Sequence, residues 1–126
     1  MRRELMIALA LAAGTVAVYA QVRRFEFVGY DDREYISENH RVQSGLTWEN
    51  VSWAFTTGHA SNWHPLTWLS LFLDFQISGA PDPFAFHLTN LVFHIANTVL
   101  LFAVFRRMTG ALYRSALVAA LFAWHP

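Results

Sequence analysis

The chain has 126 residues, of which 55% are hydrophobic and only 14% are charged, whereas an ordinary soluble domain carries roughly 25% charged residues. A soluble core of this size could not bury so many aromatic and aliphatic side chains, so the composition disfavours a free-standing soluble enzyme. Nine basic residues balance nine acidic ones, which leaves no net field to recruit nucleic acid. The absence of cysteine excludes disulfide frameworks and thiol nucleophiles.

Residues 5–22 form a first apolar segment without a charged side chain. As a helix it would reach roughly 27 Å, close to the hydrocarbon thickness of a bilayer. We therefore predict a first transmembrane helix over residues 1–22. A secretory signal cleaved after Ala20 is the alternative, but further membrane-length segments downstream favour a retained anchor.

Two adjacent aspartates, Asp31 and Asp32, follow this segment directly. One carboxylate of such a pair can stay ionised and take a proton from an attacking hydroxyl, while the charge of its neighbour tunes it. The alternative for adjacent aspartates in a loop is a turn or a solvated helix start. The two aspartates by themselves favour a turn or a solvated helix start over a catalytic role.

The loop over residues 23–85 contains two short helical patterns. Thr47 can cap a first helix over residues 48–55, and Pro65 suits the first turn of a second helix from residue 66 to about residue 77. Both helices are rich in tryptophan and too short to span a membrane, so we predict that they lie at the membrane interface. A small soluble core built from the same residues is the alternative.

The turn between these helices contains Asn62, Trp63 and His64. Aromatic side chains suit the faces of sugars, and Asn and His can hydrogen-bond to hydroxyls or phosphate. The alternative is an interfacial turn that its tryptophans anchor among lipid headgroups. The tripeptide Trp-His-Pro of this turn recurs at residues 124–126.

Residues 86–105 form a second apolar segment that ends on two arginines, which predicts a second transmembrane helix over residues 86–107. Four polar residues lie on one face of this helix, spaced three, four and three apart: His87, Asn90, His94 and Asn97. Because polar groups in hydrocarbon are costly, this polar stripe should face protein or a cavity and form helix–helix hydrogen bonds. The spacing does not fit a helical zinc site, so we predict no metal.

A third apolar segment begins at residue 111 and would reach about 21 Å at residue 124, too short to cross a bilayer. We interpret residues 111–126 as the truncated start of a third transmembrane helix. The arginine pair in the preceding short turn marks the cytoplasmic side, which places residues 23–85 in the periplasm or exterior. The exclusive use of arginine among the basic residues suggests a GC-rich bacterial genome and hence a bacterial inner membrane. The predicted fold class is an all-α membrane protein, a fragment of a polytopic fold.

Several separated blocks resemble, in the same order, the N-terminal part of bacterial membrane proteins that join a C-type glycosyltransferase fold to tetratricopeptide repeats. The blocks are YDD at 30–32, LTWE at 46–49, WAF at 53–55, NWHPLTW at 62–68, HLTN at 87–90, RRMTG at 106–110 and WHP at 124–126. These proteins are similar to the animal transmembrane-and-tetratricopeptide O-mannosyltransferases and, more distantly, to the protein O-mannosyltransferases that use dolichyl-phosphate mannose.

The resemblance implies an inverting transfer of a mannose-like sugar from a polyprenyl-phosphate carrier to an acceptor hydroxyl on a protein or glycan. The reaction would take place on the non-cytoplasmic face, at the lipid surface and without a cofactor. By resemblance, either Asp31 or Asp32 is the general base for the acceptor hydroxyl. The fragment alone would be inactive, because the later spans and the repeats of the family are missing.

An in-line displacement also needs a group that stabilises the departing phosphate, and Arg33, Arg41 and His64 are candidates for it. The other candidate substrate-binding residues are Asn62, Trp63 and His87. A function from another class stays open beside the glycosyltransferase. In that alternative, a small non-catalytic membrane protein binds a partner helix through the polar stripe.

Overall fold

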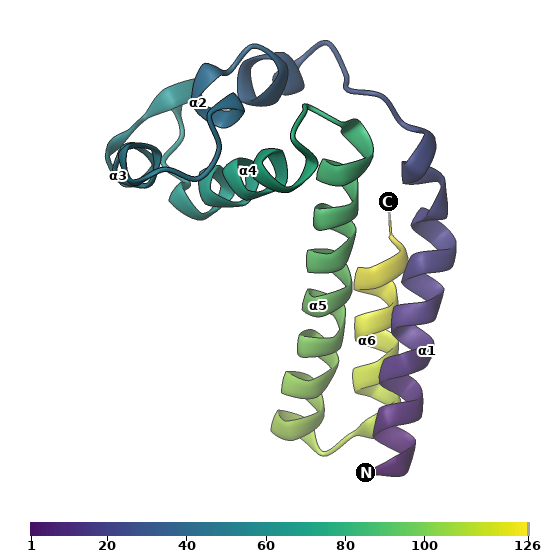
Figure 1. Cartoon of the computed structure of the whole chain (residues 1–126). Helices are drawn as coiled ribbons and strands as arrows, with labels where there is room; N and C mark the ends of the chain where they lie inside the picture. The colour runs from purple at the N-terminus through teal and green to yellow at the C-terminus, as the bar shows by residue number, and fades with distance from the viewer. Residues whose placement is uncertain (126) are drawn as a thin grey trace. The chain divides into compact units, whose positions relative to one another are not determined.

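The computed structural model describes residues 1–125, and all of their regular structure is helical (Figure 1). The prediction of an all-α protein is thus confirmed for this part of the chain, while Pro126, the end of the second Trp-His-Pro, lies outside the described residues. The chain divides into two compact units. One contains residues 1–23 and the chain from residue 88 onward, and the other contains residues 24–87.

Three apolar helices build the first unit: α1 (Arg2–Tyr19), α5 (Pro83–Thr109) from residue 88 onward, and α6 (Leu112–Trp124). A 3-10 turn, Ala20–Arg24, extends α1. The helix α1 together with its 3-10 turn, and the helix α5, are both long and apolar enough to cross a membrane. Their most apolar 18-residue stretches have mean hydropathies of 2.0 and 1.8. Only 11% of each of these stretches is buried, whereas the core helix of a soluble protein would be mostly buried. These exposures agree with the two predicted membrane spans.

The helix α5 starts at Pro83 rather than at residue 86. The side chain of Asp82 explains the earlier start, because its Oδ1 accepts a hydrogen bond of 3.2 Å from the backbone N–H of Phe84. Proline suits the first helical turn, where its missing N–H would have no partner within the helix. At the other end the helix stops at Thr109, where Gly110 follows with a φ of 69°.

Small residues on α6 allow close packing in the first unit. Ser115, Ala119 and Ala123 recur at every fourth position and are almost fully buried. Ala119 lies in a cluster with Leu11 of α1 and Phe102 of α5. Helices in a membrane gain little from burying apolar surface against each other, so small residues that permit close backbone contact favour their association.

The hydroxyl groups buried in these helices bond within their own helix. The Oγ1 of Thr15 donates to the carbonyl of Leu11, and the Oγ1 of Thr98 donates to the carbonyl of His94, both at 2.8 Å. A hydroxyl in hydrocarbon has no water to bind, and a carbonyl four residues earlier satisfies its donor. These threonines therefore need no partner from another helix.

The polar stripe of α5 divides between two environments. The Nε2 of His94 lies 3.0 Å from the carbonyl oxygen of Ala123 on α6, so this residue forms the predicted helix–helix hydrogen bond. Asn90 and Asn97 are exposed. Among the described residues, the stripe therefore does not face protein along its whole length.

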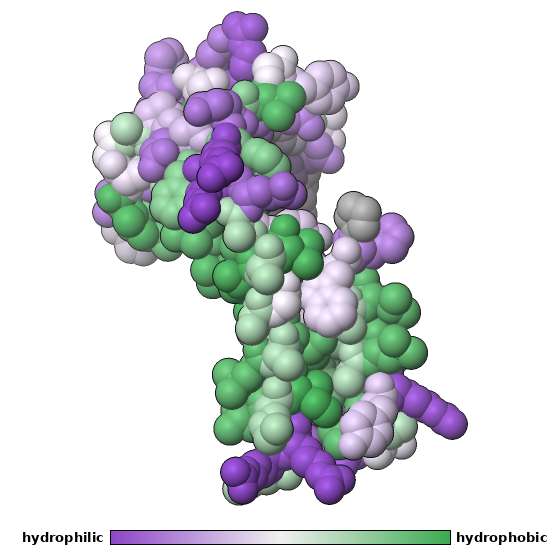
Figure 2. Space-filling model, turned by 90° about the vertical axis from the view of Figure 1, so that its right-hand side faces the viewer, coloured by the Kyte–Doolittle hydropathy of each residue, from purple (hydrophilic) through white to green (hydrophobic). Residues whose placement is uncertain are grey.

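An ion pair between α1 and α5 lies at one end of the first unit. The Nε of Arg106 donates a hydrogen bond of 3.0 Å to the Oε1 of Glu4, and the amino group of Met1 lies 3.2 Å from the other carboxylate oxygen. Figure 2 shows apolar side chains over the visible face of these helices and hydrophilic ones gathered at the end where α1 begins. The start of α1 and the end of α5 thus lie at the same end of the unit.

The second unit, residues 24–87, has a hydrophobic core of its own. Its buried residues are Ile36, Val42, Ala54, Trp68, Phe72 and Phe86. Two helices, α3 (Trp48–Thr56) and α4 (Pro65–Ser78), supply three of them. The small core that the sequence left as an alternative is therefore present. Other apolar side chains of these helices stay exposed, including Trp48 at 89% and Ile77 at 76%, and their place at a membrane interface remains a prediction.

Local signals set the bounds of these two helices. The Oγ1 of Thr47 accepts a hydrogen bond of 3.2 Å from the backbone N–H of Asn50, which confirms the predicted cap of α3. Pro65 occupies the first turn of α4, as predicted, and Gly79 ends that helix in a left-handed conformation with a φ of 70°. Only a residue without a Cβ adopts this conformation without strain.

Two short elements between residues 33 and 43 were not predicted. A π-helical turn spans Arg33–Ser37, and α2 covers His40–Gln43. The side chain of Asn39 caps α2 by accepting hydrogen bonds from the backbone N–H groups of Arg41 and Val42. Neither element is long enough to produce a periodic pattern of apolar residues.

Replacement of Ala119 by leucine should destabilise the first unit by about 1–3 kcal/mol, because the added atoms have no space in a packed core. Val118 is 41% exposed on the same helix, so Val118→Leu is the matched control and should change stability little. The measurement is denaturant unfolding of the purified protein in detergent micelles, followed by circular dichroism. Equal stability of the two variants would contradict the close packing at Ala119.

Candidate functional site

The two predicted catalytic aspartates have different surroundings. The Oδ2 of Asp32, which is half-buried, accepts a hydrogen bond of 2.7 Å from the backbone N–H of Val28. Asp31 is exposed, and its carboxylate forms no hydrogen bond or ion pair with any residue that the structure describes. Asp32 therefore holds the turn over residues 28–32, whereas the carboxylate of Asp31 is available to a ligand.

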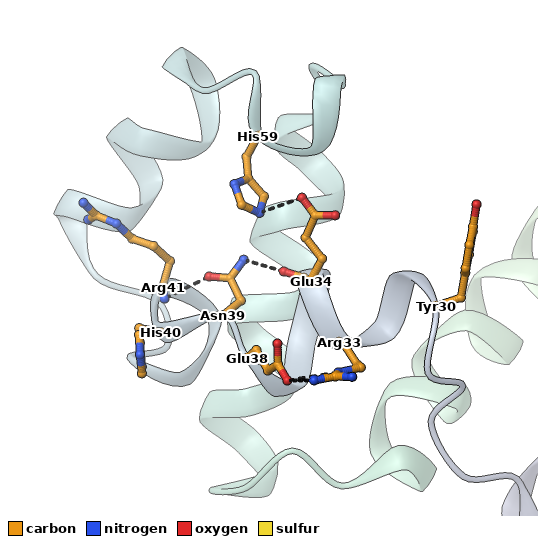
Figure 3. Close-up of a pocket in the computed structure, with 8 residues that line it drawn as sticks. All are labelled: Tyr30, Arg33, Glu34, Glu38, Asn39, His40, Arg41 and His59. Atoms are coloured by element: carbon orange, nitrogen blue, oxygen red, sulfur yellow. Dashed lines mark hydrogen bonds and ion pairs between the residues drawn. The ribbon is translucent and has the colours of Figure 1, made fainter.

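A surface groove of about 390 Å³ includes Tyr30, the neighbour of Asp31 in the chain (Figure 3). Besides Tyr30, the groove is lined by Arg33, Glu34, Glu38, Asn39, His40, Arg41 and His59. The structure thus brings two of the predicted phosphate-binding residues, Arg33 and Arg41, to one groove. Carboxylates, imidazoles and guanidinium groups all line it, so the groove can both donate and accept hydrogen bonds.

The guanidinium group of Arg33 is paired with Glu38. The Nε of Arg33 donates a hydrogen bond of 3.0 Å to the Oε1 of Glu38, and its Nη2 contacts the same oxygen. The hydrogen bond to Glu38 and the charge of that carboxylate raise the pKa of Arg33 above its usual value, so the side chain stays cationic. Both side chains are more than half exposed, and an exposed pair of this kind is weak enough for an anionic ligand to displace the carboxylate.

The guanidinium group of Arg41 is paired as well. Its Nη1 lies 2.6 Å from the Oε1 of Glu49, and its central carbon lies 5.9 Å from the centre of the Trp53 ring. Beneath it, the Nδ2 of the buried Asn50 donates to the backbone carbonyl of Arg41 at 3.0 Å. The backbone of Arg41 is therefore fixed, while its side chain is 40% exposed and its guanidinium group lies among Glu49, Asn50 and Trp53.

A pair that sequence reasoning missed lies across the groove. The Nε2 of His59 lies 3.6 Å from the Oε1 of Glu34, as the dashed line in Figure 3 shows. The next residues, Ala60 and Ser61, have positive φ values of 53° and 60°. Residues with a Cβ rarely adopt this conformation, and it persists only where surrounding contacts enforce it. No motif or spacing in the sequence connects Glu34 with His59, so only the fold reveals the pair.

The predicted residues Trp63 and His64 lie at a different groove, an apolar one of about 480 Å³. The Nε1 of Trp63 donates a hydrogen bond of 2.9 Å to the carbonyl of Phe55, while 67% of the residue remains exposed. The ring of His64 packs 5.3 Å from that of Trp68. His64 therefore belongs to an aromatic cluster and does not line the groove that contains Arg33 and Arg41.

The remaining predicted residues, Asn62 and His87, line neither of these grooves. The Nδ2 of Asn62 donates to the hydroxyl of Tyr35 at 3.3 Å, and His87 packs its ring 6.4 Å from that of Phe25. Across residues 1–125, no group of three or more His, Asp or Glu side chains could hold a metal ion.

Comparison with known proteins identifies the family to which the chain belongs. The chain is 35% identical over 104 residues to Protein O-mannosyl-transferase Tmtc2 of Drosophila melanogaster, an alignment that covers 77% of this chain and 11% of the relative. It is 32% identical over 139 residues to the human Protein O-mannosyl-transferase TMTC4, which covers 92% of this chain and 18% of the relative. No family model matches the chain, and no solved structure matches it.

The apolar spans and these relatives show that the chain corresponds to a segment of the proteins in a family of membrane glycosyltransferases. The chain belongs to the transmembrane-and-tetratricopeptide O-mannosyltransferases, as the sequence blocks indicated. It spans between 11% and 18% of the length of these two relatives.

Replacement of Asp32 by alanine should release the turn over residues 28–32, because the backbone N–H of Val28 loses its acceptor. Hydrogen exchange at the amide of Val28 should become roughly tenfold faster, the factor expected for the loss of a hydrogen bond to a charged group. Asp32→Asn is the matched control, because its side-chain carbonyl can still accept this hydrogen bond. Unchanged exchange in Asp32→Ala would show that the carboxylate does not hold the turn.

Proposed function

We propose that this chain forms the first spans and the first loop of an enzyme that transfers a mannose-like sugar from a polyprenyl phosphate to a hydroxyl group of an acceptor protein. The relatives support the class, since both are protein O-mannosyl-transferases by name. The observation that carries the proposal is the difference between the two aspartates. Asp32 is engaged in the fold, while Asp31, which does not itself line the groove, has an unengaged carboxylate and follows the groove residue Tyr30 in the chain.

In this proposal Asp31 acts as the general base. Its carboxylate takes the proton of the acceptor hydroxyl, and the hydroxyl oxygen then forms a bond to the anomeric carbon of the sugar. The bond between that carbon and the phosphate oxygen breaks, and the polyprenyl phosphate leaves with the electron pair. Attack from the side opposite the leaving group inverts the configuration at the anomeric carbon. A base within hydrogen-bond reach of the hydroxyl typically accelerates such a step by about 100-fold to 10,000-fold.

The groove supplies cations for the phosphate in this proposal. The guanidinium groups of Arg33 and Arg41 are planar donors that match phosphate oxygens in two-point contacts. Both are at present paired with exposed carboxylates, those of Glu38 and Glu49. Binding of the donor would exchange these carboxylates for phosphate oxygens, which preserves the charge balance of each guanidinium group.

The proposed orientation places residues 24–87 on the non-cytoplasmic side. The contact between Glu4 and Arg106 brings the arginines at positions 2, 3 and 107 to one end of the first unit. Arginine clusters at the ends of membrane-spanning helices typically lie on the cytoplasmic side of the membrane. The loop between the two spans then lies on the opposite side, which is the periplasm if the host membrane is the bacterial inner membrane that we infer from the arginine usage.

The exposed apolar side chains of α3 and α4 fit a position at the lipid surface in this proposal. Trp48, Trp63 and Leu66 are 89%, 67% and 74% exposed, and tryptophan favours the headgroup region of a bilayer. Such a position would hold the groove within reach of a donor whose polyprenyl chain stays in the membrane.

Replacement of Asp31 by asparagine should abolish sugar transfer in the full-length protein that carries this segment. The amide keeps the size of the carboxylate and cannot act as a base, so turnover should fall by about 100-fold or more. The assay follows transfer of mannose from a mannosyl polyprenyl phosphate to an acceptor peptide. Glu26→Gln, which removes another exposed carboxylate from the same loop, is the matched control and should transfer at the normal rate. Normal transfer by Asp31→Asn would exclude the proposed base.

The orientation has its own test in cells that express the full-length protein. A cysteine at Tyr30 should react with a membrane-impermeant maleimide that is added outside intact cells. A cysteine at Met108, which is 75% exposed beside Arg107, should react only after the membrane is permeabilised. The opposite labelling pattern would place the acidic loop in the cytoplasm and reject the orientation.

A further inference from the structure

The charged residues of the chain are divided unequally between its two units. The first unit contains six arginines and a single carboxylate, that of Glu4, whereas residues 24–87 contain three arginines and eight acidic residues. The arginines of the first unit are Arg2, Arg3, Arg23, Arg106, Arg107 and Arg114. All except Arg23 lie where α1 starts, where α5 ends or where α6 starts, the end at which hydrophilic side chains gather in Figure 2. The neutral chain therefore has one strongly basic end.

A pocket of about 170 Å³ lies at this basic end. It is lined by Glu4 of α1 and by Phe102, Ala103, Arg106 and Arg107 of α5. We call it the arginine pocket. Two guanidinium groups and two apolar side chains thus line the same depression, which suits a ligand that has both an anionic and an apolar part.

The two guanidinium groups are free to bind an anion. The Nε of Arg106 donates its hydrogen bond of 3.0 Å to Glu4, while its two terminal nitrogens have no partner among the described residues. Two such nitrogens form a planar pair of donors that matches two phosphate oxygens. Arg107 is exposed and forms no hydrogen bond or ion pair within residues 1–125. Glu4 therefore orients one guanidinium group, and the other has no carboxylate to compete with a ligand.

We propose that the arginine pocket binds the phosphate group of an anionic phospholipid. Both membrane-length helices have an end here, and the ends of a helix that spans a bilayer lie at the level of the lipid headgroups. Arginines at this level attract anionic lipids.

The apolar surroundings of the pocket favour a lipid over a free phosphate ion. Apolar side chains follow Glu4 on α1, and Leu5, Met6 and Leu9 are 61%, 62% and 61% exposed. Acyl chains can contact this surface while the phosphate binds the arginines, whereas inorganic phosphate has no apolar part. A zwitterionic headgroup carries a cation that the arginines repel, so the ligand should have a net negative charge.

The first test measures lipid binding to the full-length protein by native mass spectrometry. The probes are phosphatidylglycerol and phosphatidylcholine of equal chain length, and we expect phosphatidylglycerol to bind more tightly. Arg107→Gln should weaken its binding roughly fivefold, the contribution of one arginine close to an anionic lipid. Arg23→Gln is the matched control, because it removes an exposed arginine beyond the other end of α1, and it should leave the affinity unchanged.

Three results of this test would overturn the proposal. Equal affinities for the two lipids would show that the pocket does not select an anionic headgroup. Equal weakening by Arg107→Gln and Arg23→Gln would show that only the overall charge attracts the lipid. Release of phosphatidylglycerol by millimolar inorganic phosphate would assign the pocket to a free phosphate ion, whereas we expect the lipid to stay bound.

A second measurement compares thermal unfolding of the full-length protein in nanodiscs of different composition. A lipid that contacts both α1 and α5 stabilises the folded state, so phosphatidylglycerol should raise the midpoint by a few degrees above that in pure phosphatidylcholine. The increase should be smaller in Arg107→Gln than in the unchanged protein and in Arg23→Gln. In pure phosphatidylcholine the three midpoints should agree, since the loss of one exposed side chain changes stability little. Equal increases in all three proteins would contradict a site at Arg107.

Discussion

The second unit depends on the burial of one indole ring, that of Trp68. The residue is fully buried, and the ring of Tyr35 stacks on it at 5.0 Å with an angle of 9° between the planes. Trp53, His59 and His64 contact the same ring at 5.1, 5.5 and 5.3 Å. Aromatic pairs at such distances stabilise a fold beyond the area that they bury.

This arrangement links the core directly to the candidate site. Tyr35 fixes the π-helical turn that carries Arg33 and Glu34, and Trp53 lies beneath the guanidinium group of Arg41. His59 contacts Trp68 while it faces Glu34 across the groove. The groove therefore adjoins the aromatic core, and the rings of Tyr35 and Trp53 help to position Arg33, Glu34 and Arg41.

The sequence predicted those features that local interactions determine. A threonine cap, a proline in a first turn and uncharged apolar runs act within one helix, so α3, α4 and the two membrane-length helices were found close to their observed bounds. The turn Arg33–Ser37 and the pairs Arg33–Glu38 and Glu34–His59 depend on side chains that the tertiary fold brings together. No periodicity marks them, so the sequence offered Arg33 and Arg41 as phosphate-binding candidates without indicating that each is paired with a carboxylate.

The ion pair between Glu4 and Arg106 joins residues that are 102 positions apart, and this separation has a consequence for biosynthesis. At roughly 5–20 residues per second, a ribosome needs on the order of 5 to 20 seconds to add Arg106 after Glu4. During this interval α1 has to remain inserted without its arginine partner. The contact between the start of α1 and the end of α5 can form only after Arg106 has left the ribosome, so it is a late step in the assembly of the first unit.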